Sequence, residues 1–273
     1  MNLLLALLIL ANDPLQDVRF VMIQAGRYLV GAPGHACNPR REVELDCFEI
    51  SATEVTNRQF AGFIESTGYL TDAETNGFGM TFREGMDDWH WDSTPGATWR
   101  LPFGPDGPGT EDKPNHPVTQ ISIRDARAYC RWAGVRLPTV AEWEVAARGP
   151  YPVNRRYPWG DELAPKGEYL ANTWQGESHH QNSLEDGHLY TAPVASYPPN
   201  DWGLYDVIGN VFEYVEDPTA LDEKGNPLAA GRGGSWWCSE KTCSYYNLYD
   251  VGRQNVRATL ANQGFRVVRD PER

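Results

Sequence analysis

Two cysteines near the C-terminal end are the residues with the most distinctive chemistry. Cys238 and Cys243 are separated by four residues and follow the turn-forming sequence Gly233-Gly234-Ser235. A structural zinc site needs about four ligands, and no further cysteine or histidine lies close to this pair in the sequence. A disulfide, a redox-active thiol pair and a two-thiolate site for copper(I), a soft ion suited to sulfur ligands, all fit the spacing. The spacing alone does not choose between these three.

The N-terminus and the remaining cysteines bear on the cellular compartment. Residues 1–11 form an apolar run that is too short to span a bilayer comfortably and is similar to the hydrophobic region of a signal peptide. We therefore predict a signal peptide or N-terminal apolar segment over residues 1–17, no membrane span, and a secreted or periplasmic protein, with a cytoplasmic location as the alternative. In an oxidising compartment Cys37 and Cys47 could pair. Cys130 is expected on the buried face of a helix.

The composition indicates one folded domain and excludes one class of partner. Apolar residues make up 41% of the chain, which is enough for a sizeable core. The formal net charge is −13, and because nucleic-acid phosphates are bound by clustered Lys and Arg, we expect no nucleic-acid partner. The charge is compatible with a basic peptide substrate or bound cations. No linker marks a boundary, so residues 18–273 are predicted to form a single α+β domain with low regular secondary structure.

Strands are expected early in the chain and a long loop after them. Residues 18–50 are predicted to form strands, because Val43, Leu45 and Cys47 recur at a period of two. Residues 72–118 are rich in Trp, Gly, Pro and Asp without a clear period, so we expect a long ordered loop or functional insertion there.

Three helices are predicted from start and stop signals. Each begins after a Ser or Thr that can bond the backbone three residues on, where Gln, Asp or Glu can bond back. Each ends at a glycine. The capping residues are Thr56, Ser122 and Thr139, and the terminating glycines are Gly68, Gly134 and Gly149. Beyond the third helix we expect loops and short strands.

Motifs spread over most of the chain occur in the order found in one known family. The matching stretches are 53–57, 66–69, 116–118, 125–134, 136–139, 141–144, 157–160, 172–177, 203–205, 209–211, 233–235 and 264–266. By these motifs the chain resembles the formylglycine-generating enzyme and sulfatase-modifying factor family. The resemblance implies the sulfatase-modifying-factor fold, which is C-type-lectin-like, for residues 18–273. The fold alone does not imply activity, because one fold serves several functions.

The resemblance also implies a chemistry for the cysteine pair. In the family's oxidases two cysteines at this spacing after Gly-Gly-Ser bind copper(I), and Cys238 and Cys243 occupy those positions. The implied reaction is the copper-dependent oxidation, by O2, of a cysteine in a substrate peptide or protein, such as a sulfatase, to Cα-formylglycine. Ser235 would lie by the pocket and bond the substrate sulfur or a water. The protein is expected to be a monomer.

Calcium is a second implication of the resemblance. The family binds calcium in two loops through carboxylate, amide and backbone carbonyl oxygens, which suit a hard cation. Matching positions for the first loop are Asn172, Thr173, Asp186 and His188. Matching positions for the second are Asp206, Gly209, Val211 and Glu213. The backbone carbonyl would be the ligand at Thr173, His188, Gly209 and Val211.

The sequence departs from the family pattern where a substrate should dock. Residues 239–242 and 244–247 replace a stretch that is more basic and aromatic in sulfatase-activating members, and one extra residue precedes Gln254. Ala146 and Val267 stand where animal members have disulfide cysteines. The copper chemistry is therefore compatible with a different target peptide.

Two other hypotheses compete with the oxidase. In a non-catalytic binding module, Cys238 and Cys243 would form a disulfide and the aromatic loop from Trp89 to Trp99 would grip a protein or glycan. An iron-dependent sulfoxide synthase would need a histidine cluster and an added helical domain, and this sequence shows neither.

Overall fold

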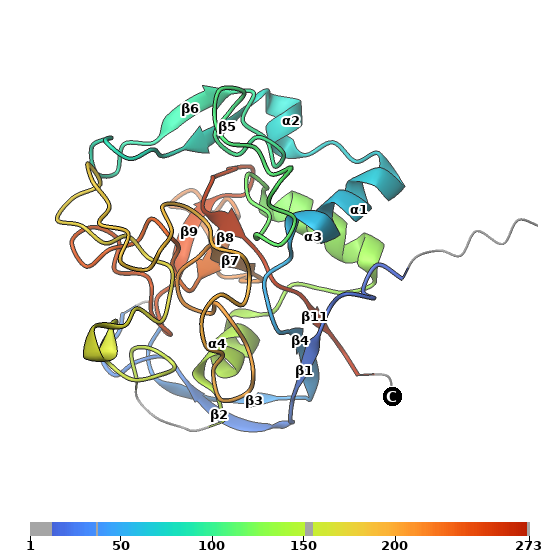
Figure 1. Cartoon of the computed structure of the whole chain (residues 1–273). Coiled ribbons are helices and arrows are strands. Elements are labelled where there is room, and N and C mark those ends of the chain that lie inside the picture. Colours follow the sequence, from blue (N-terminus) through green and yellow to red (C-terminus); the bar gives the residue numbers. More distant parts are fainter. Residues whose placement is uncertain (1–12, 37, 151–154, 272–273) are drawn as a thin grey trace, which may run out of the picture.

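Strands from both ends of the chain meet in one small antiparallel sheet. The computed structural model describes residues 13–36, 38–150 and 155–271. Within them the sheet has the order β1–β4–β11, and β2 pairs with β3 in a separate ribbon (Figure 1). The bounds are β1 Phe20–Ile23, β2 Gly26–Val30, β3 Arg41–Leu45, β4 Phe48–Ser51 and β11 Val268–Arg269. Most of the predicted signal peptide, residues 1–12, lies outside the described residues.

The predicted alternation around β3 is only partly right. Val43 and Leu45 are half-buried, but the strand ends at Leu45 and Cys47 is an exposed free thiol. The next buried residue is Phe48, which begins β4. Because the chain turns between the two strands, the period of two does not continue across the turn. Cys37, the expected partner of Cys47, lies outside the described residues.

The three predicted helices are confirmed with their caps. They are α1 (Asn57–Thr67), α3 (Ile123–Ala133) and α4 (Val140–Arg148). The preceding Thr or Ser forms a reciprocal capping box in each case, which satisfies backbone N–H groups that have no partner inside the helix. Gly68 and Gly134 end α1 and α3 in the left-handed conformation that glycine adopts without strain.

The segment 72–118, expected to be a long loop, contains three short regular elements. A capping box between Thr71 and Glu74 starts α2 (Asp72–Asn76), and β5 (Phe78–Thr81) pairs with β6 (Asp92–Pro95). These elements are shorter than the windows in which periodicity can be recognised, so the sequence pattern did not reveal them. The loop between the two strands carries Trp89 and Trp91.

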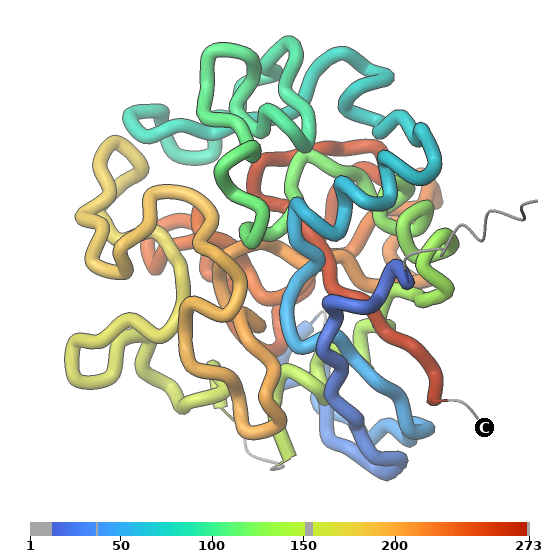
Figure 2. The backbone as a smooth tube through the Cα atoms, turned by 45° about the vertical axis from the view of Figure 1, so that its right-hand side comes forward, coloured from blue at the N-terminus to red at the C-terminus, as the bar shows by residue number. Residues whose placement is uncertain are grey.

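A four-stranded sheet lies at the centre of the molecule and carries the cysteine segment. Its strand order is β10–β7–β8–β9, with β10 parallel to β7 and the other pairs antiparallel. The bounds are β7 Phe212–Val215, β8 Leu228–Arg232, β9 Gly252–Asn255 and β10 Gln263–Gly264. Both cysteines lie in the connection from β8 to β9. In Figures 1 and 2 the yellow and orange loops, including the 3-10 turn η1 (Pro165–Gly167), gather on the side opposite α1 and α3.

The interior is filled mainly by aromatic side chains. One cluster packs α1 and α3 against Tyr214 and Phe265, and it includes Cys130, which is buried as predicted. The second cluster surrounds Trp143 and Trp236 and includes both Cys238 and Cys243. No helix in the described part of the chain is long and apolar enough to cross a membrane. The fold is the predicted α+β domain, with loops rather than long elements supplying most of the packing.

Candidate active site

Cys238 and Cys243 are adjacent, buried free thiols. The side chain of Cys238 is fully buried and that of Cys243 is 3% exposed, and the two are not joined by a disulfide. Burial, and then the neighbouring Cys243 thiol, raises the pKa of the Cys238 thiol. The segment can turn this tightly only with glycine at position 234, where φ is 75° and a Cβ atom would lie 2.5 Å from Tyr246.

Ser235 lies against Cys238. Its hydroxyl oxygen accepts a hydrogen bond from the side-chain amide of Asn262 at 2.9 Å and one from the backbone N–H of Trp237 at 3.4 Å. The hydroxyl hydrogen is then free to point at Cys238 Sγ, which is 3.9 Å from Ser235 Oγ. Ser235 is fully buried, so in this structure its partner is the Cys238 sulfur rather than a group in the solvent-facing pocket.

A cavity of about 190 Å³ opens beside the thiol pair. Cys243 lines it, whereas Cys238 lies behind. Three indole rings, those of Trp89, Trp91 and Trp237, form one wall, which we call the tryptophan wall. The remaining lining comes largely from the central sheet and the segment after Cys243: Phe212, Gly231, Tyr245, Gly252, Arg253, Gln254, Leu260, Asn262 and Gln263. The sequence indicated the aromatic loop only as a possible protein or glycan grip, and its place beside Cys243 was not predicted.

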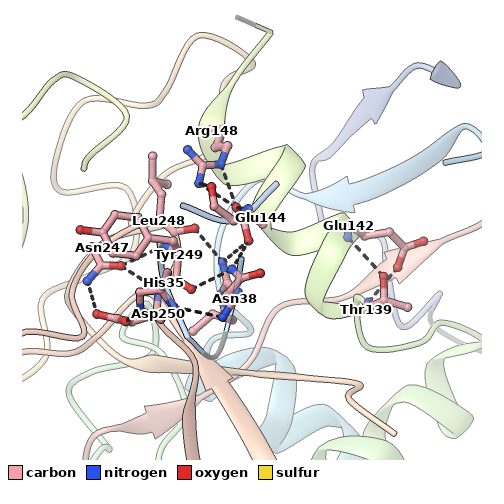
Figure 3. Close-up of polar contacts among 12 residues, drawn as sticks. His35, Asn38, Thr139, Glu142, Glu144, Arg148, Asn247, Leu248, Tyr249 and Asp250 are labelled. Atoms are coloured by element: carbon pink, nitrogen blue, oxygen red, sulfur yellow. Dashed lines mark hydrogen bonds and ion pairs between the residues drawn. The ribbon is translucent and has the colours of Figure 1, made fainter. Parts of the chain in front are cut away.

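The segment that follows Cys243 is held by a buried ionic network (Figure 3). Glu144 on α4 accepts hydrogen bonds from Arg148 and from Arg232, the last residue of β8. Arg232 also donates to the carbonyl of Leu248 at 2.7 Å, and Asn38 bridges Glu144 Oε2 and the carbonyl of Tyr249, each at 2.8 Å. One carboxylate therefore ties the strand before the cysteines to the loop after them.

A second contact fixes the same loop from outside. His35 Nε2 lies 2.6 Å from a carboxylate oxygen of Asp250, and Asn247 donates to the other oxygen at 2.6 Å. Figure 3 shows these three side chains next to the Glu144 network. The segment after Cys243, where the sequence departs from the family pattern, is thus a loop held by several hydrogen bonds.

The first loop predicted to hold calcium is closed on itself by hydrogen bonds. Asp186 accepts from the backbone N–H groups of Thr173 at 2.9 Å and His188 at 3.0 Å, and from the side-chain amide of Gln175 at 2.7 Å. The same Gln175 amide contacts the Thr173 carbonyl. The buried Asn172 amide oxygen has no hydrogen-bond partner among the described residues. The four predicted residues do come together, but a cation would have to displace the Gln175 amide.

The second loop has a more open set of oxygen atoms. Asp206 Oδ2 accepts from the backbone N–H of Ala195 at 2.6 Å, while its Oδ1 has no partner in the described part of the chain. Glu213, in contrast, is saturated by Arg266 at 2.5 and 2.6 Å and by the indole N–H of Trp143 at 2.6 Å. Gly209 is required here, because a Cβ atom would lie 2.2 Å from the Asn172 carbonyl oxygen.

The side chain of Glu54 contacts this second loop, although the sequence did not indicate a role for it. Its side chain is 1% exposed, one oxygen accepts from Asn210 at 3.0 Å, and the other has no described partner. Burial, followed by the charges of Asp206 and Glu213, raises the pKa of Glu54. Burial also raises the pKa of Asp206 to about 6. Three carboxyl groups thus face one arginine, Arg266, and excess buried negative charge favours a bound cation.

Neither loop is a complete cage of acidic side chains. Within residues 13–36, 38–150 and 155–271, no three His, Cys, Asp or Glu side chains are grouped closely enough to hold a metal ion. A hard cation at the second loop would therefore need backbone carbonyls in addition to Asp206 and Glu54. A soft, low-coordinate cation at the thiol pair would keep a position open for a ligand from outside the chain.

Residues 10–271 match a family model described as the sulfatase-modifying factor enzyme 1-like domain. The chain belongs to this family. It is 40% identical to the formylglycine-generating enzyme of Thermomonospora curvata over 92% of this chain and 93% of that protein. It is also 37% identical to the inactive Cα-formylglycine-generating enzyme 2 of Bos taurus, over 81% of this chain and 77% of that protein. The solved structure of PvdO from Pseudomonas aeruginosa covers 92% of this chain and 94% of its own, with a TM-score of 0.63 and 23% identity.

The likeness to PvdO shows the fold alone, and the family includes both active and inactive relatives. What this member of the sulfatase-modifying factor enzyme family does therefore depends on its own site. Cys238, Cys243 and Ser235, which the sequence predicts to be catalytic, lie together, and of the three only Cys243 lines the cavity. The residues that the sequence did not single out are the tryptophan wall and Glu54.

Proposed function

We propose that this chain is a copper-dependent oxidase that converts a cysteine of a substrate protein to Cα-formylglycine, the modification that matures sulfatases. The observation that carries the proposal is the pair of adjacent free thiols, one of which lines a cavity large enough for a side chain. Close similarity to an enzyme named for this reaction supports it. The substrate class is a polypeptide with an accessible cysteine, a sulfatase being the first candidate.

The thiol pair suits a soft metal ion. Burial raises the pKa of the Cys238 thiol, so two buried thiolates require a bound cation to compensate their charge. Copper(I) is matched to such sulfur ligands, and when bound it would hold the substrate thiolate and oxygen together and pass electrons between them. Ser235 is placed to donate a hydrogen bond to the Cys238 sulfur. A substrate cysteine entering the cavity would reach the exposed side of Cys243.

The cavity walls restrict water and orient the peptide. Trp91 and Trp237 are largely apolar surfaces beside Cys243, and apolar walls exclude solvent from a reacting thiolate. In the product, the substrate cysteine has lost its sulfur and two hydrogens and gained an oxygen; the sulfur leaves as hydrogen sulfide, and water supplies the aldehyde oxygen. Because reduction of O2 to water takes more electrons than this oxidation releases, an added thiol reductant supplies the remainder.

The proposal is tested with purified protein loaded with copper(I). A synthetic peptide containing a sulfatase active-site cysteine is incubated with it, O2 and a thiol reductant, and the peptide is analysed by mass spectrometry. We expect conversion of the cysteine to the aldehyde, and loss of both conversion and tight copper(I) binding in Cys238→Ser and Cys243→Ser. The matched control is Cys47→Ser, because Cys47 is an exposed free thiol away from the cavity.

Two results would contradict the proposal. One is a wild-type protein that binds copper(I) no more tightly than the double cysteine variant. The other is a disulfide between Cys238 and Cys243 in the unreduced, metal-free protein that persists under turnover conditions. The second result would instead favour the binding module.

We also propose that the loop containing Asp206 binds calcium. The partnerless oxygens of Asp206 and Glu54 are the observation that supports it. The loop of Asn172 and Asp186 is the second proposed site, with the Gln175 amide moving away when the ion binds. Calorimetric titration of calcium into chelator-treated protein counts the sites, and Asp206→Asn and Asp186→Asn assign them.

A further inference from the structure

A fully buried histidine lies directly behind the tryptophan wall. The ring of His179 stacks on that of Trp237, with centroids 4.5 Å apart and planes inclined by 10°. Its Nε2 is 2.7 Å from the backbone carbonyl oxygen of Trp237, the residue before Cys238. Its Nδ1 is 2.7 Å from a carboxylate oxygen of Asp88, which also accepts the backbone N–H of His179 at 2.9 Å. None of these contacts was expected from the sequence.

The hydrogen-bond partners determine which form of His179 is present. A backbone carbonyl can only accept, so Nε2 carries a hydrogen. Desolvation raises the pKa of Asp88, but the hydrogen bonds and charge of His179 and the charge of His180 outweigh it, and the net result is a lowered pKa. The ionised carboxylate likewise only accepts, so Nδ1 carries a hydrogen as well. Both ring nitrogens of His179 therefore face hydrogen-bond acceptors, the Asp88 carboxylate and the Trp237 carbonyl, and this arrangement fits a doubly protonated ring.

Few other charges influence this ion pair. The aromatic neighbours that pack on the ring are Phe82, Trp174 and Trp237. His180 and Asp87, the sequence neighbours of His179 and Asp88, form a second, exposed pair with His180 Nε2 3.4 Å from a carboxylate oxygen of Asp87. The Cys238 thiol follows Trp237 in the chain. Asp88 is thus the carboxylate in direct contact with the ring, and the pair is shielded from water on one side only, because His179 is fully buried while the Asp88 side chain is 37% exposed.

The contact between Asp88 and His179 also joins the loop that carries Trp89 and Trp91 to the segment of His179. Trp89 and Trp91 sit on Trp237 edge to face, with ring centroids 4.8 and 5.6 Å away. The backbone N–H of Gly85 donates to the carbonyl of His179 at 3.0 Å. Trp89 has a φ of 67°, a conformation that a bulky residue keeps only where its surroundings impose it. Asp88, the residue before it, supplies that constraint through His179.

We propose that His179, as an imidazolium bound by Asp88, is a positioning residue that fixes the tryptophan wall and thereby sets the affinity of the cavity for its peptide substrate. The part that concerns substrate rests on the proposed function. His179 does not line the cavity, so it acts through Trp237 and through the loop of Trp89 and Trp91.

The first experiment measures steady-state kinetics of the copper-loaded protein with the sulfatase cysteine peptide. Asp88→Asn keeps the size of the side chain but removes the charge, and we expect KM to rise on the order of tenfold with kcat changed less than about twofold. The matched control is Asp87→Asn, because Asp87 is the adjacent, exposed carboxylate, and its KM should equal that of the wild type. His179→Gln should behave as Asp88→Asn does, and His180→Gln should have the smaller effect.

The second experiment does not depend on turnover. NMR of 15N-histidine-labelled protein near neutral pH should show one imidazole with both nitrogens protonated, assigned to His179 by its absence from His179→Gln. In Asp88→Asn we expect this signal to change to that of a neutral ring and the indole N–H signals of the wall to shift. Asp87→Asn should leave both unchanged.

The outcomes separate the two proposals. A neutral His179 in the wild type, or a KM for Asp88→Asn no higher than for Asp87→Asn, overturns the positioning role. Absence of peptide turnover by the wild type contradicts the proposed function only. The NMR signals of His179 and of the indole N–H groups then test whether His179 positions the tryptophan wall. Indole signals that shift in Asp88→Asn support the role, and signals that stay unchanged overturn it.

Discussion

Two buried clusters of carboxylates and arginines can be compared within this molecule. In the first, Glu144 lies between Arg148 and Arg232, and both of its oxygens accept hydrogen bonds (Figure 3). In the second, Glu54 and Asp206 each keep one oxygen without a described partner, although Arg266 lies close by. Both clusters are shielded from water to a similar degree. They differ in charge balance.

The difference separates a structural ion network from the proposed cation site. Burial would raise the pKa of Glu144, but Arg232, Arg148 and the hydrogen bonds from Asn38 and Gly31 outweigh burial and lower it. In the second cluster Glu213 already occupies Arg266, and the pKa of Asp206 is raised to about 6. A folded protein tolerates buried charge only where a partner compensates it. In the first cluster both carboxylate oxygens have arginine partners, and the groups without a described partner are the Nε and Nη1 of Arg232; in the second cluster carboxylate oxygens lack a partner.

The largest expected effect comes from unbalancing the first cluster. Glu144→Gln would leave the fully buried Arg232 without its carboxylate, and removing one partner of a buried pair costs about 3–5 kcal/mol. Urea unfolding measures this loss of stability. The control is Glu49→Gln, which breaks a partly exposed pair with Arg269 and should cost at most about 1 kcal/mol. Equal losses in the two variants would show that the Glu144 network is no more important than a surface pair.

Supplying the missing partner should stabilise the second cluster. Calcium at about a hundredfold excess over its Kd is expected to stabilise the chelator-treated protein by about 2.7 kcal/mol per site, since it binds only the folded state. Asp206→Asn should remove that site's contribution. Glu54→Gln should make the metal-free protein more stable, because burial and the charges of Asp206 and Glu213 disfavour ionisation of Glu54, and should weaken the calcium response. A Glu54→Gln variant with an unchanged response would exclude Glu54 from the site.

The two clusters should respond to pH in opposite directions. The raised pKa of Asp206 means that its contribution to the stability of the metal-free protein is fully present below the ordinary value of 3.8 and is lost as the pH rises through about 6. The loss is expected to be about 2 to 3 kcal/mol. Glu144, with its lowered pKa, stabilises the fold above its ordinary value of 4.5 and loses this contribution as the pH falls through the folded-state pKa.

Urea unfolding at a series of pH values, with chelator and with calcium, measures both effects. The decline toward neutral pH should be smaller in Asp206→Asn, where the raised pKa of Glu54 remains, and absent in the presence of calcium. A decline in Asp206→Asn equal to that of the wild type would assign it to groups other than Asp206.

The smallest expected effect concerns the half-buried contact between His35 and Asp250. Asp250→Asn should cost about 1 kcal/mol, because the single amide oxygen can keep one of the two hydrogen bonds that the carboxylate accepts while the other is lost. The variant should keep the copper affinity of the wild type if the Glu144 network alone holds the loop. A copper affinity that falls with Asp250→Asn would show that this outer contact also positions Cys243.

The parts of the fold that depend on neighbouring residues were predictable from the sequence. Thr56, Ser122 and Thr139 begin helices through bonds that reach only three residues along the chain. Strand register across turns was not predictable, as Cys47 shows, because the turn resets which side chains face inward. The elements α2, β5 and β6, which follow Thr71, were not predicted because each is too short to show a periodic pattern.

The same distinction applies to the site. Cys238, Cys243 and Ser235 are close in sequence, so their pattern carried the prediction. The residues that complete the surroundings come from far apart: Asp88 meets His179, and Glu54 meets Asn210, 91 and 156 positions away. Such contacts depend on the tertiary fold and leave no local pattern. Trp89 and Trp91 were noticed as aromatic residues, but the sequence did not indicate which cavity they line.

One backbone hydrogen bond connects the two proposed metal sites. The N–H of Trp174 donates to the Cys238 carbonyl at 2.9 Å, and the N–H of the preceding Thr173 donates to Asp186. An ion that rearranges the Asp186 loop would therefore also move the main chain that carries the thiol. Thermodynamic linkage makes such coupling reciprocal, so any factor by which calcium tightens copper binding must equal the factor by which copper tightens calcium binding.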